Sequence, residues 1–154
     1  NTAALLEAMD TGKVSGYMTD FPSEAILGKP GIVCTPHLGA STEEAEDNCA
    51  IMAVRELMDY FENGNITNSV NYPACDMGVC PAGLTRIALL HKNVPNMIAQ
   101  ISSILGDDNV NIANFMNKAR GDYAYTLIDM DQAPSDEAIA KLREIEGVRR
   151  VRLI

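Results

Sequence analysis

The sequence predicts two kinds of fold in succession: the last part of a doubly wound α/β domain, and then a ferredoxin-like α+β unit in the order βαββαβ. Short apolar runs at 14–19 and 31–35 are typical of buried parallel strands. From residue 84 onward, strand-like and helix-like periods alternate in the order of the second fold. Charge separates the same two parts, because residues 1–83 carry 12 acidic and 3 basic side chains, whereas residues 84–154 carry 9 of each.

Two helices are expected around the strands of the first part. Residues 3–9 form a short helix, capped by one of the two residues before it. A second helix begins after Ser41, because Glu44 stands three residues later in the spacing of a capping box, and it runs to about residue 63. Its apolar side chains form one stripe, made of Ala45, Cys49, Met52, Ala53, Leu57, Tyr60 and Phe61. We interpret this stripe as a packing surface.

The second part contains six expected elements after a linker. Residues 76–83 hold two glycines and a proline, which is typical of a connection between domains. Strands are predicted around 87–89, over 123–130 and over 148–154, and a further strand opens with Val110 and Ile112. Helices are predicted over 95–106 and from Ser135 to 147. This order matches the split βαββαβ fold of about 70 residues.

Composition excludes several classes of function. A net charge of −9 without a basic stripe argues against a nucleic-acid partner. No apolar run approaches the ~18 residues of a membrane span, and no signal peptide is recognisable, so we expect a cytoplasmic protein without a membrane partner. The four cysteines, at 34, 49, 75 and 80, lack the usual spacing of zinc or redox pairs. We expect reduced thiols, no metal, and, since the chain begins with Asn1, a piece of a longer protein.

His37 is the first candidate for chemistry. It follows Pro36 at the end of an apolar strand and precedes a helix start, in the segment CTPHLGASTEEA at 34–45. Proline fixes its own φ and biases the residue before it toward an extended conformation, so the histidine is held at the mouth of the strand. Because an unperturbed imidazole titrates near neutrality, it suits general acid/base work. A structural loop histidine is the alternative interpretation.

The TPHLGAST motif at 35–42 resembles the catalytic-histidine segment of the D-isomer-specific 2-hydroxyacid dehydrogenases. The resemblance extends upstream to residue 3 and downstream through SVNYP at 69–73, and it covers nearly the whole chain. The part after residue 83 looks like an ACT domain, a small-molecule sensing module, and narrows the resemblance to the phosphoglycerate dehydrogenases of that family.

The resemblance implies an NAD-dependent oxidation of 3-phosphoglycerate to 3-phosphohydroxypyruvate, the first step of L-serine biosynthesis. His37 matches the family's proton acceptor, Glu24 the acid that orients it, and Asp20 the aspartate near the nicotinamide carboxamide. The family pattern Asp-Val-Phe-x-x-Glu is one residue shorter here, and a solvated loop glutamate remains an alternative for Glu24. No G-x-G-x-x-G occurs, and the family's substrate-binding arginine has no match, so we expect the chain alone to be catalytically inactive and not to bind NAD.

The ACT-like part keeps an effector site by the same resemblance. His91, Asn93 and Asn111 match the residues that bind the inhibitor L-serine across two paired ACT domains. The family usually has glycine after the proline, and Asn96 stands there instead, which leaves open a related amino acid as effector. A capped strand end is the alternative for His91. The resemblance also implies a homodimer or higher homo-oligomer through this part.

The resemblance divides the chain into four segments. Residues 1–40 are the C-terminal end of an NAD-binding domain, 41–75 a crossover helix and the return to a substrate domain, 76–83 the linker, and 84–154 the ACT domain. Two alternative functions stay open. One is a module for effector binding and dimerisation only, and the other is a different 2-hydroxyacid dehydrogenase, such as a hydroxypyruvate reductase.

Overall fold

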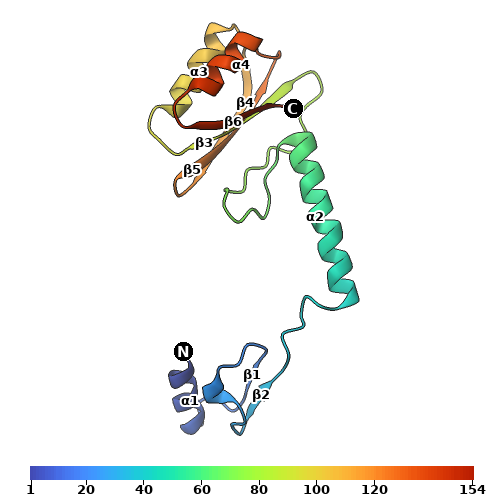
Figure 1. Ribbon diagram of the computed structural model, residues 1–154, viewed down its shortest axis with the longest axis vertical. Helices are drawn as coiled ribbons and strands as arrows, with labels where there is room; N and C mark the ends of the chain where they lie inside the picture. Colours follow the sequence, from blue (N-terminus) through green and yellow to red (C-terminus); the bar gives the residue numbers. More distant parts are fainter. The chain divides into compact units, whose positions relative to one another are not determined.

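The computed structural model describes all 154 residues, and the chain divides into two compact units, 1–51 and 52–154 (Figure 1). The boundary falls inside helix α2 (Glu43–Asn63), which therefore contributes to both units. The predicted α/β elements lie in the first unit, and the predicted βαββαβ elements lie in the second.

The first unit is a small α/β arrangement. Its elements are α1 (Thr2–Asp10), β1 (Tyr17–Thr19), the 3-10 helix η1 (Glu24–Ile26) and β2 (Ile32–Cys34). The side chain of Asn1 caps α1 by accepting hydrogen bonds from two backbone N–H groups. The two strands pair in parallel, so the predicted parallel arrangement is confirmed, although each strand is only three residues long. Ile26 is the only buried residue of this unit.

Helix α2 begins one residue later than the capping box predicts. The N–H of Ser41 donates to the carbonyl of Leu38 and closes a turn. Thr42 is the cap instead, since its Oγ1 accepts from the N–H of Ala45 at 3.1 Å. None of the residues of α2 is fully buried. Of the apolar stripe that we interpret as a packing surface, Tyr60 packs against the core of the second unit, whereas Met52, Leu57 and Phe61 are exposed. No helix of the protein combines the length and the apolar character needed to cross a bilayer.

The second unit is a four-stranded antiparallel sheet with two helices. Its elements are β3 (Thr85–Lys92), α3 (Met97–Asp107), β4 (Ile112–Arg120), β5 (Tyr123–Met130), α4 (Asp136–Glu144) and β6 (Val148–Leu153). The strands lie in the order β4-β5-β3-β6, which leaves β4 and β6 as the two edges. The predicted ferredoxin-like βαββαβ fold is confirmed by this order and pairing.

Both faces of the sheet are covered. Helices α3 and α4 lie together on one face (Figure 1). The core beneath them consists of Ile87, Leu89, Met97, Ile101, Leu105, Val110, Ile128, Met130, Leu142, Ile145 and Val151. On the other face, Ala88, Tyr125 and Leu127 pack with Ile66 and Cys75 from the segment that follows α2. Burial raises the pKa of the Cys75 thiol to about 11, so this cysteine is a packing residue rather than a reactive one.

Arg86 and Asp129 join the sheet to the segment that follows α2. Both side chains are buried, and they form an ion pair. The guanidinium also donates to the carbonyls of Asn63 at 2.9 Å and Gly78 at 2.6 Å. The hydroxyl of Tyr125 donates to the carbonyl of Gly64 at 2.7 Å. The bonds to Asn63 and Gly64 satisfy backbone carbonyls at the end of the helix, which have no partner within it. The predicted linker at 76–83 thus supplies a carbonyl to a buried arginine.

Helix α3 begins at Met97, two residues after the proline at which the sequence places its start. Asn96 precedes it with φ +65° in the left-handed region. Glycine and asparagine adopt this conformation most easily, so the backbone accounts for the choice of Asn96 at a position where the resembled family usually has glycine. The helix ends at Asp107, so Gly106 lies inside it and does not close it.

Candidate functional site

His37 and Asp20 meet at the carboxyl ends of the two parallel strands. Asp20 follows β1, His37 lies three residues beyond β2, and the register places Thr19 opposite Cys34. The imidazole Nδ1 is 3.0 Å from Asp20 Oδ2. The histidine and aspartate side chains are 65% and 50% exposed, so the ring is accessible from solvent. In open α/β sheets ligands bind outside the carboxyl ends of strands, which is where this pair lies.

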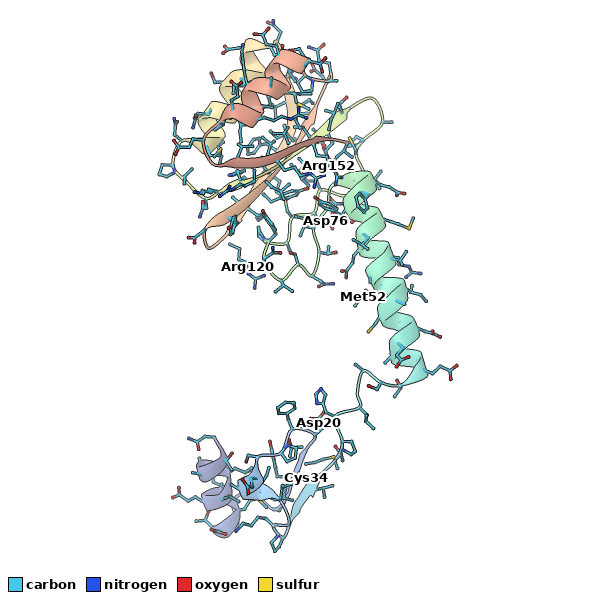
Figure 2. All side chains as sticks on the ribbon, in the orientation of Figure 1. Asp20, Cys34, Met52, Asp76, Arg120 and Arg152 are labelled. Carbon is cyan, nitrogen blue, oxygen red and sulfur yellow. The ribbon has the colours of Figure 1, made fainter.

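Glu24 lies on a different element from the two residues that meet. It opens η1, directly after Ser23, and is exposed to solvent. No hydrogen bond or ion pair joins it to His37 in this structure, and its predicted role as the orienting acid stays a prediction. Phe21 contacts the histidine instead, with its ring edge-on to the imidazole and the centroids 5.5 Å apart. In Figure 2, Asp20, directly after β1, and Cys34, the last residue of β2, mark the carboxyl ends of the two strands.

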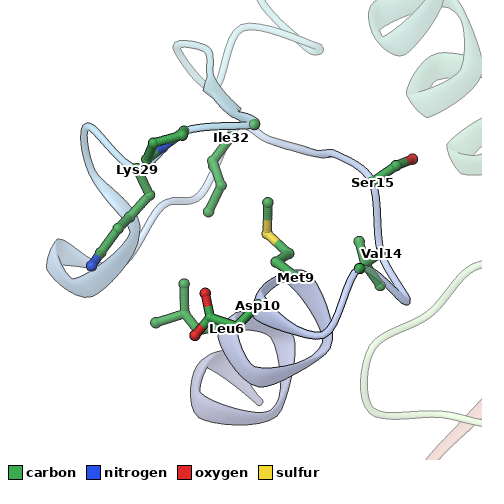
Figure 3. A pocket seen from close by; sticks show the side chains of 10 residues that line it. Leu6, Met9, Asp10, Val14, Ser15, Lys29 and Ile32 are labelled. Atoms are coloured by element: carbon green, nitrogen blue, oxygen red, sulfur yellow. The ribbon is translucent and has the colours of Figure 1, made fainter.

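A cavity of about 580 Å³ opens elsewhere in the first unit, between α1 and the strands. Figure 3 shows Met9 and Ile32 reaching toward each other across it, with Lys29 at its edge. Neither His37 nor Asp20 lines it, so it does not belong to the pair described above. No group of three or more His, Cys, Asp or Glu side chains is gathered as a metal site would require.

His91 is a buried residue of the sheet, only 2% exposed. Its Nδ1 is 2.8 Å from the carbonyl of Lys92, and its Nε2 is 2.8 Å from Thr126 Oγ1. Because a carbonyl only accepts hydrogen bonds, Nδ1 carries a proton. Thr126 Oγ1 in turn lies 2.8 Å from Asn117 Oδ1. Both ring nitrogens are therefore engaged within the sheet, and the effector-binding role of His91 stays a prediction.

Asn93 and Asn111 are exposed residues that lie at opposite ends of the sheet. The amide of Asn93 donates to the carbonyl of Gly121 at 3.2 Å, in the turn between β4 and β5. Asn111 precedes β4, and its N–H donates to Asp131 Oδ1 at 3.0 Å. His91 pairs with Ala124, and Ile112 pairs with Met130, which is six residues farther along β5. At the usual rise of a strand this separates the two ends by about 20 Å.

Thr126 and Asn117 are functional candidates that sequence reasoning missed. Thr126 lies in the apolar strand β5 and Asn117 opposite it in β4, and both face the same side as the helix-covered core. A polar residue on the apolar face of a strand is the signal that could have found them, since buried polar groups are normally hydrogen-bonded.

No family model matches the chain. The D-3-phosphoglycerate dehydrogenases of Haemophilus influenzae and Escherichia coli K12 are 28% and 27% identical to it, and each alignment covers 98% of this chain. D-3-phosphoglycerate dehydrogenase 2 of Saccharomyces cerevisiae is 28% identical over 93% of the chain. The chain spans 39%, 40% and 31% of the lengths of these three relatives.

Two solved structures are similar to part of the chain. The ACT domain from GTP pyrophosphokinase of Chlorobium tepidum matches 46% of this chain and 96% of its own, with 20% identity and a TM-score of 0.41. The regulatory subunit of aspartate kinase from Thermus thermophilus matches 47% of this chain and 52% of its own, with 14% identity and a TM-score of 0.39.

The resemblance predicted from TPHLGAST and the C-terminal pattern is confirmed. The sequence similarity runs through both units, and the strand order of the second unit is that of a ferredoxin-like split fold. The chain is thus similar, along nearly its whole length, to D-3-phosphoglycerate dehydrogenases, and it carries a ferredoxin-like βαββαβ unit after residue 83.

Proposed function

We propose that this chain is the part of an NAD-dependent D-3-phosphoglycerate dehydrogenase that carries its proton acceptor and its effector-binding unit. The whole protein would oxidise 3-phosphoglycerate to 3-phosphohydroxypyruvate, the first step of L-serine biosynthesis. The observation that carries this proposal is His37 in contact with a carboxylate at the carboxyl ends of parallel strands, in a chain similar to such dehydrogenases over 98% of its length. The exposed Met18 and Val33 on these strands fit a pair that belongs to a larger parallel sheet.

His37 would accept the proton of the substrate hydroxyl. A ring whose Nδ1–H donates to a carboxylate keeps a lone pair on Nε2, and that nitrogen can take a proton. The exposed ring leaves this nitrogen open to a substrate. NAD would take the hydride from the same carbon in the whole protein. The residues of this chain do not by themselves form a site for it, because the 154 residues contain no glycine-rich phosphate loop.

The effector site would form between two copies of the second unit. The edge strand β4 is exposed along most of its length and can pair with its copy across a two-fold axis. Antiparallel pairing centred on Met116 sets Ile112 opposite the partner's Arg120 and so brings Asn111 beside Gly121 of the other copy. Asn93 already donates to the carbonyl of that glycine. The residues that one chain holds about 20 Å apart would then meet at one seam.

The other edge is less suited to self-pairing. Antiparallel pairing of the whole edge strand β6 with its copy would set Arg149 opposite the partner's Arg152. Like charges directly opposite each other destabilise a strand pair. On β4 no such pair arises, because Arg120 meets Ile112 and Lys118 meets Asn114. Charge therefore favours β4 as the dimer edge.

L-serine, or a closely related amino acid, fits the groups at this seam. The amides of Asn93 and Asn111 offer donors for a carboxylate and acceptors for an ammonium group. The buried His91, hydrogen-bonded to Thr126, would support the strand end from which Asn93 projects rather than offer a free nitrogen.

Calorimetric titration of the 154-residue chain with L-serine tests the proposal. We expect binding by the wild type, and its loss in both Asn93→Ala and Asn111→Ala. Asn48→Ala is the matched control, since Asn48 is an exposed residue of α2 outside the seam. Retained binding in both seam variants, or a monomer by sedimentation at the titration concentration, would contradict the two-chain site.

Effector binding without catalysis is the second candidate function. It is favoured by the distribution of buried residues, since the second unit holds nearly the whole core. The two candidates differ in one assay: the full-length protein reduces NAD with 3-phosphoglycerate under the first proposal and does not under the second.

A further inference from the structure

The acid in contact with His37 is not the one that the sequence pattern singles out. Asp20 Oδ2 lies 3.0 Å from Nδ1, and the neighbouring Phe21 ring stands edge-on against the imidazole at an interplanar angle of 86°. Two consecutive residues thus contact two different parts of the same ring. Glu24 belongs to η1 and makes no polar contact with the histidine.

The backbone holds Asp20 in this place from both sides. Before it, the carbonyl of Thr19 accepts from the N–H of Thr35 at 3.0 Å, which joins the ends of the two strands. After it, the N–H of Phe21 donates to Thr19 Oγ1 at 3.1 Å. The aspartate is therefore fixed relative to Thr35, only two residues before His37.

His37 is held by a turn of its own. Pro36 fixes the φ before it, and the N–H of Leu38 donates to the carbonyl of Pro36 at 3.1 Å. The pairing of the two side chains follows from the strand register and these local bonds. It does not depend on η1, in which Glu24 lies.

We infer that Asp20 is the positioning residue that sets the tautomer of His37. A carboxylate only accepts hydrogen bonds, so the nitrogen that faces it must carry hydrogen. Nδ1–H is thereby selected, and Nε2 is left with the lone pair that can accept a substrate proton. The role in catalysis rests on the proposed function above, whereas the tautomer itself is a property of this chain alone.

The tautomer can be measured directly. Nitrogen-15 chemical shifts of the histidine rings in the 154-residue chain, at about pH 9 where an unperturbed imidazole is neutral, report the ratio of Nδ1–H to Nε2–H forms. The chain has two histidines, and His37→Gln assigns their signals. We expect Nδ1–H to dominate at His37, and Asp20→Ala to lower its ratio to Nε2–H about threefold or more. Glu24→Ala is the matched control and leaves the ratio unchanged.

A second measurement monitors whether the two strands still pair in the variants. Exchange protection of the Thr35 N–H reports whether β1 and β2 still pair, and Asp20→Leu, which also lacks an acceptor, replaces Asp20→Ala if that protection is lost. An unchanged ratio in the aspartate variant, or an equal change in Glu24→Ala, would overturn the inference. Neither readout needs NAD or substrate, so a failure of the proposed dehydrogenase activity would leave this result intact.

Discussion

Arg86 and Asp129 form a two-pronged ion pair within the sheet, with Nε 2.6 Å from Oδ1 and Nη2 3.0 Å from Oδ2. Hydrogen bonding to Asp129 raises the pKa of the Arg86 guanidinium further above its ordinary value. The remaining donors of the guanidinium serve carbonyls of the segment that follows α2. The pair therefore links the effector-binding sheet of the proposed function to the end of α2.

Replacing Arg86 should strongly destabilise the second unit. Arg86→Met leaves the buried Asp129 without its charged partner and removes the donor from the carbonyls of Asn63, Met77 and Gly78. Breaking a buried pair in this way costs about 3–5 kcal/mol. Urea unfolding of the 154-residue chain measures the loss. The exposed Arg150→Met on β6 is the control and should stay within about 0.5 kcal/mol of wild type. A loss below about 1 kcal/mol in Arg86→Met would mean that the pair is dispensable.

A side chain at Gly64 is expected to destabilise the chain. It ends α2 with φ +74°, and a Cβ there would overlap Ile154 Cδ1 and lie 3.0 Å from Leu127 Cδ2. Gly64→Ala should destabilise the chain by about 2–4 kcal/mol, from backbone strain and overpacking together. Gly78→Ala is a matched comparison, because φ is +65° but no atom lies within 4 Å of its Cβ. Equal losses in thermal unfolding of the two variants would contradict the packing argument.

The contribution of Asp108 to stability should depend on pH. The N–H and hydroxyl of Ser135 donate to its carboxylate at 2.7 Å each and lower the pKa of Asp108 below its ordinary value. A lowered pKa in the folded state stabilises the fold above the unfolded pKa, about 3.9, and this gain is lost as pH falls through the folded value. The difference in unfolding free energy between wild type and Asp108→Ala should therefore be constant above about pH 5 and shrink in acid. The exposed Ser103→Ala on α3, which removes no titratable group, should show no such trend in the same urea titrations.

His37 should matter for catalysis in the full-length protein. His37→Ala should lower kcat for NADH formation from 3-phosphoglycerate by about 10²–10⁴-fold, the usual contribution of a positioned general base. The exposed Lys13→Ala should keep the wild-type rate. A change below about threefold would make His37 a structural loop residue. The 154-residue chain alone should form no NADH, because it lacks a glycine-rich phosphate loop.

The sequence predicts the second unit well, since every strand and helix there has its own apolar period. Tyr123–Met130 is a largely apolar run, buried at every position but the first, and is found as β5 with the predicted bounds. Ser135 caps α4 by accepting from the N–H of Ala138. The start of α3 is less predictable, because Asn96 adopts a positive φ that no periodicity reveals. Arg86 is likewise hidden, since a lone arginine in a strand is usually exposed, and only the returning segment at 63–78 explains its burial.

In the candidate sites, too, the sequence predicts the local features and not those that depend on distant parts of the chain. Sequence places His37 at a strand end correctly, because proline and the apolar run before it act locally. Which carboxylate meets the ring depends on strand register and on the turn after Thr19, and these lie beyond a pattern of residue types. Asn93 and Asn111 each have a clear local place, but only the sheet topology shows that one chain keeps them apart.

Mixing two defective variants tests the central claim, an effector site shared between two copies, most directly. A dimer of Asn93→Ala with Asn111→Ala holds one site with both changes and one site with neither. After equal amounts exchange subunits at random, half of the dimers are mixed, so calorimetry should find L-serine binding at about one quarter of the wild-type stoichiometry with wild-type affinity. No recovered binding in a mixture that demonstrably exchanges subunits would contradict the shared site.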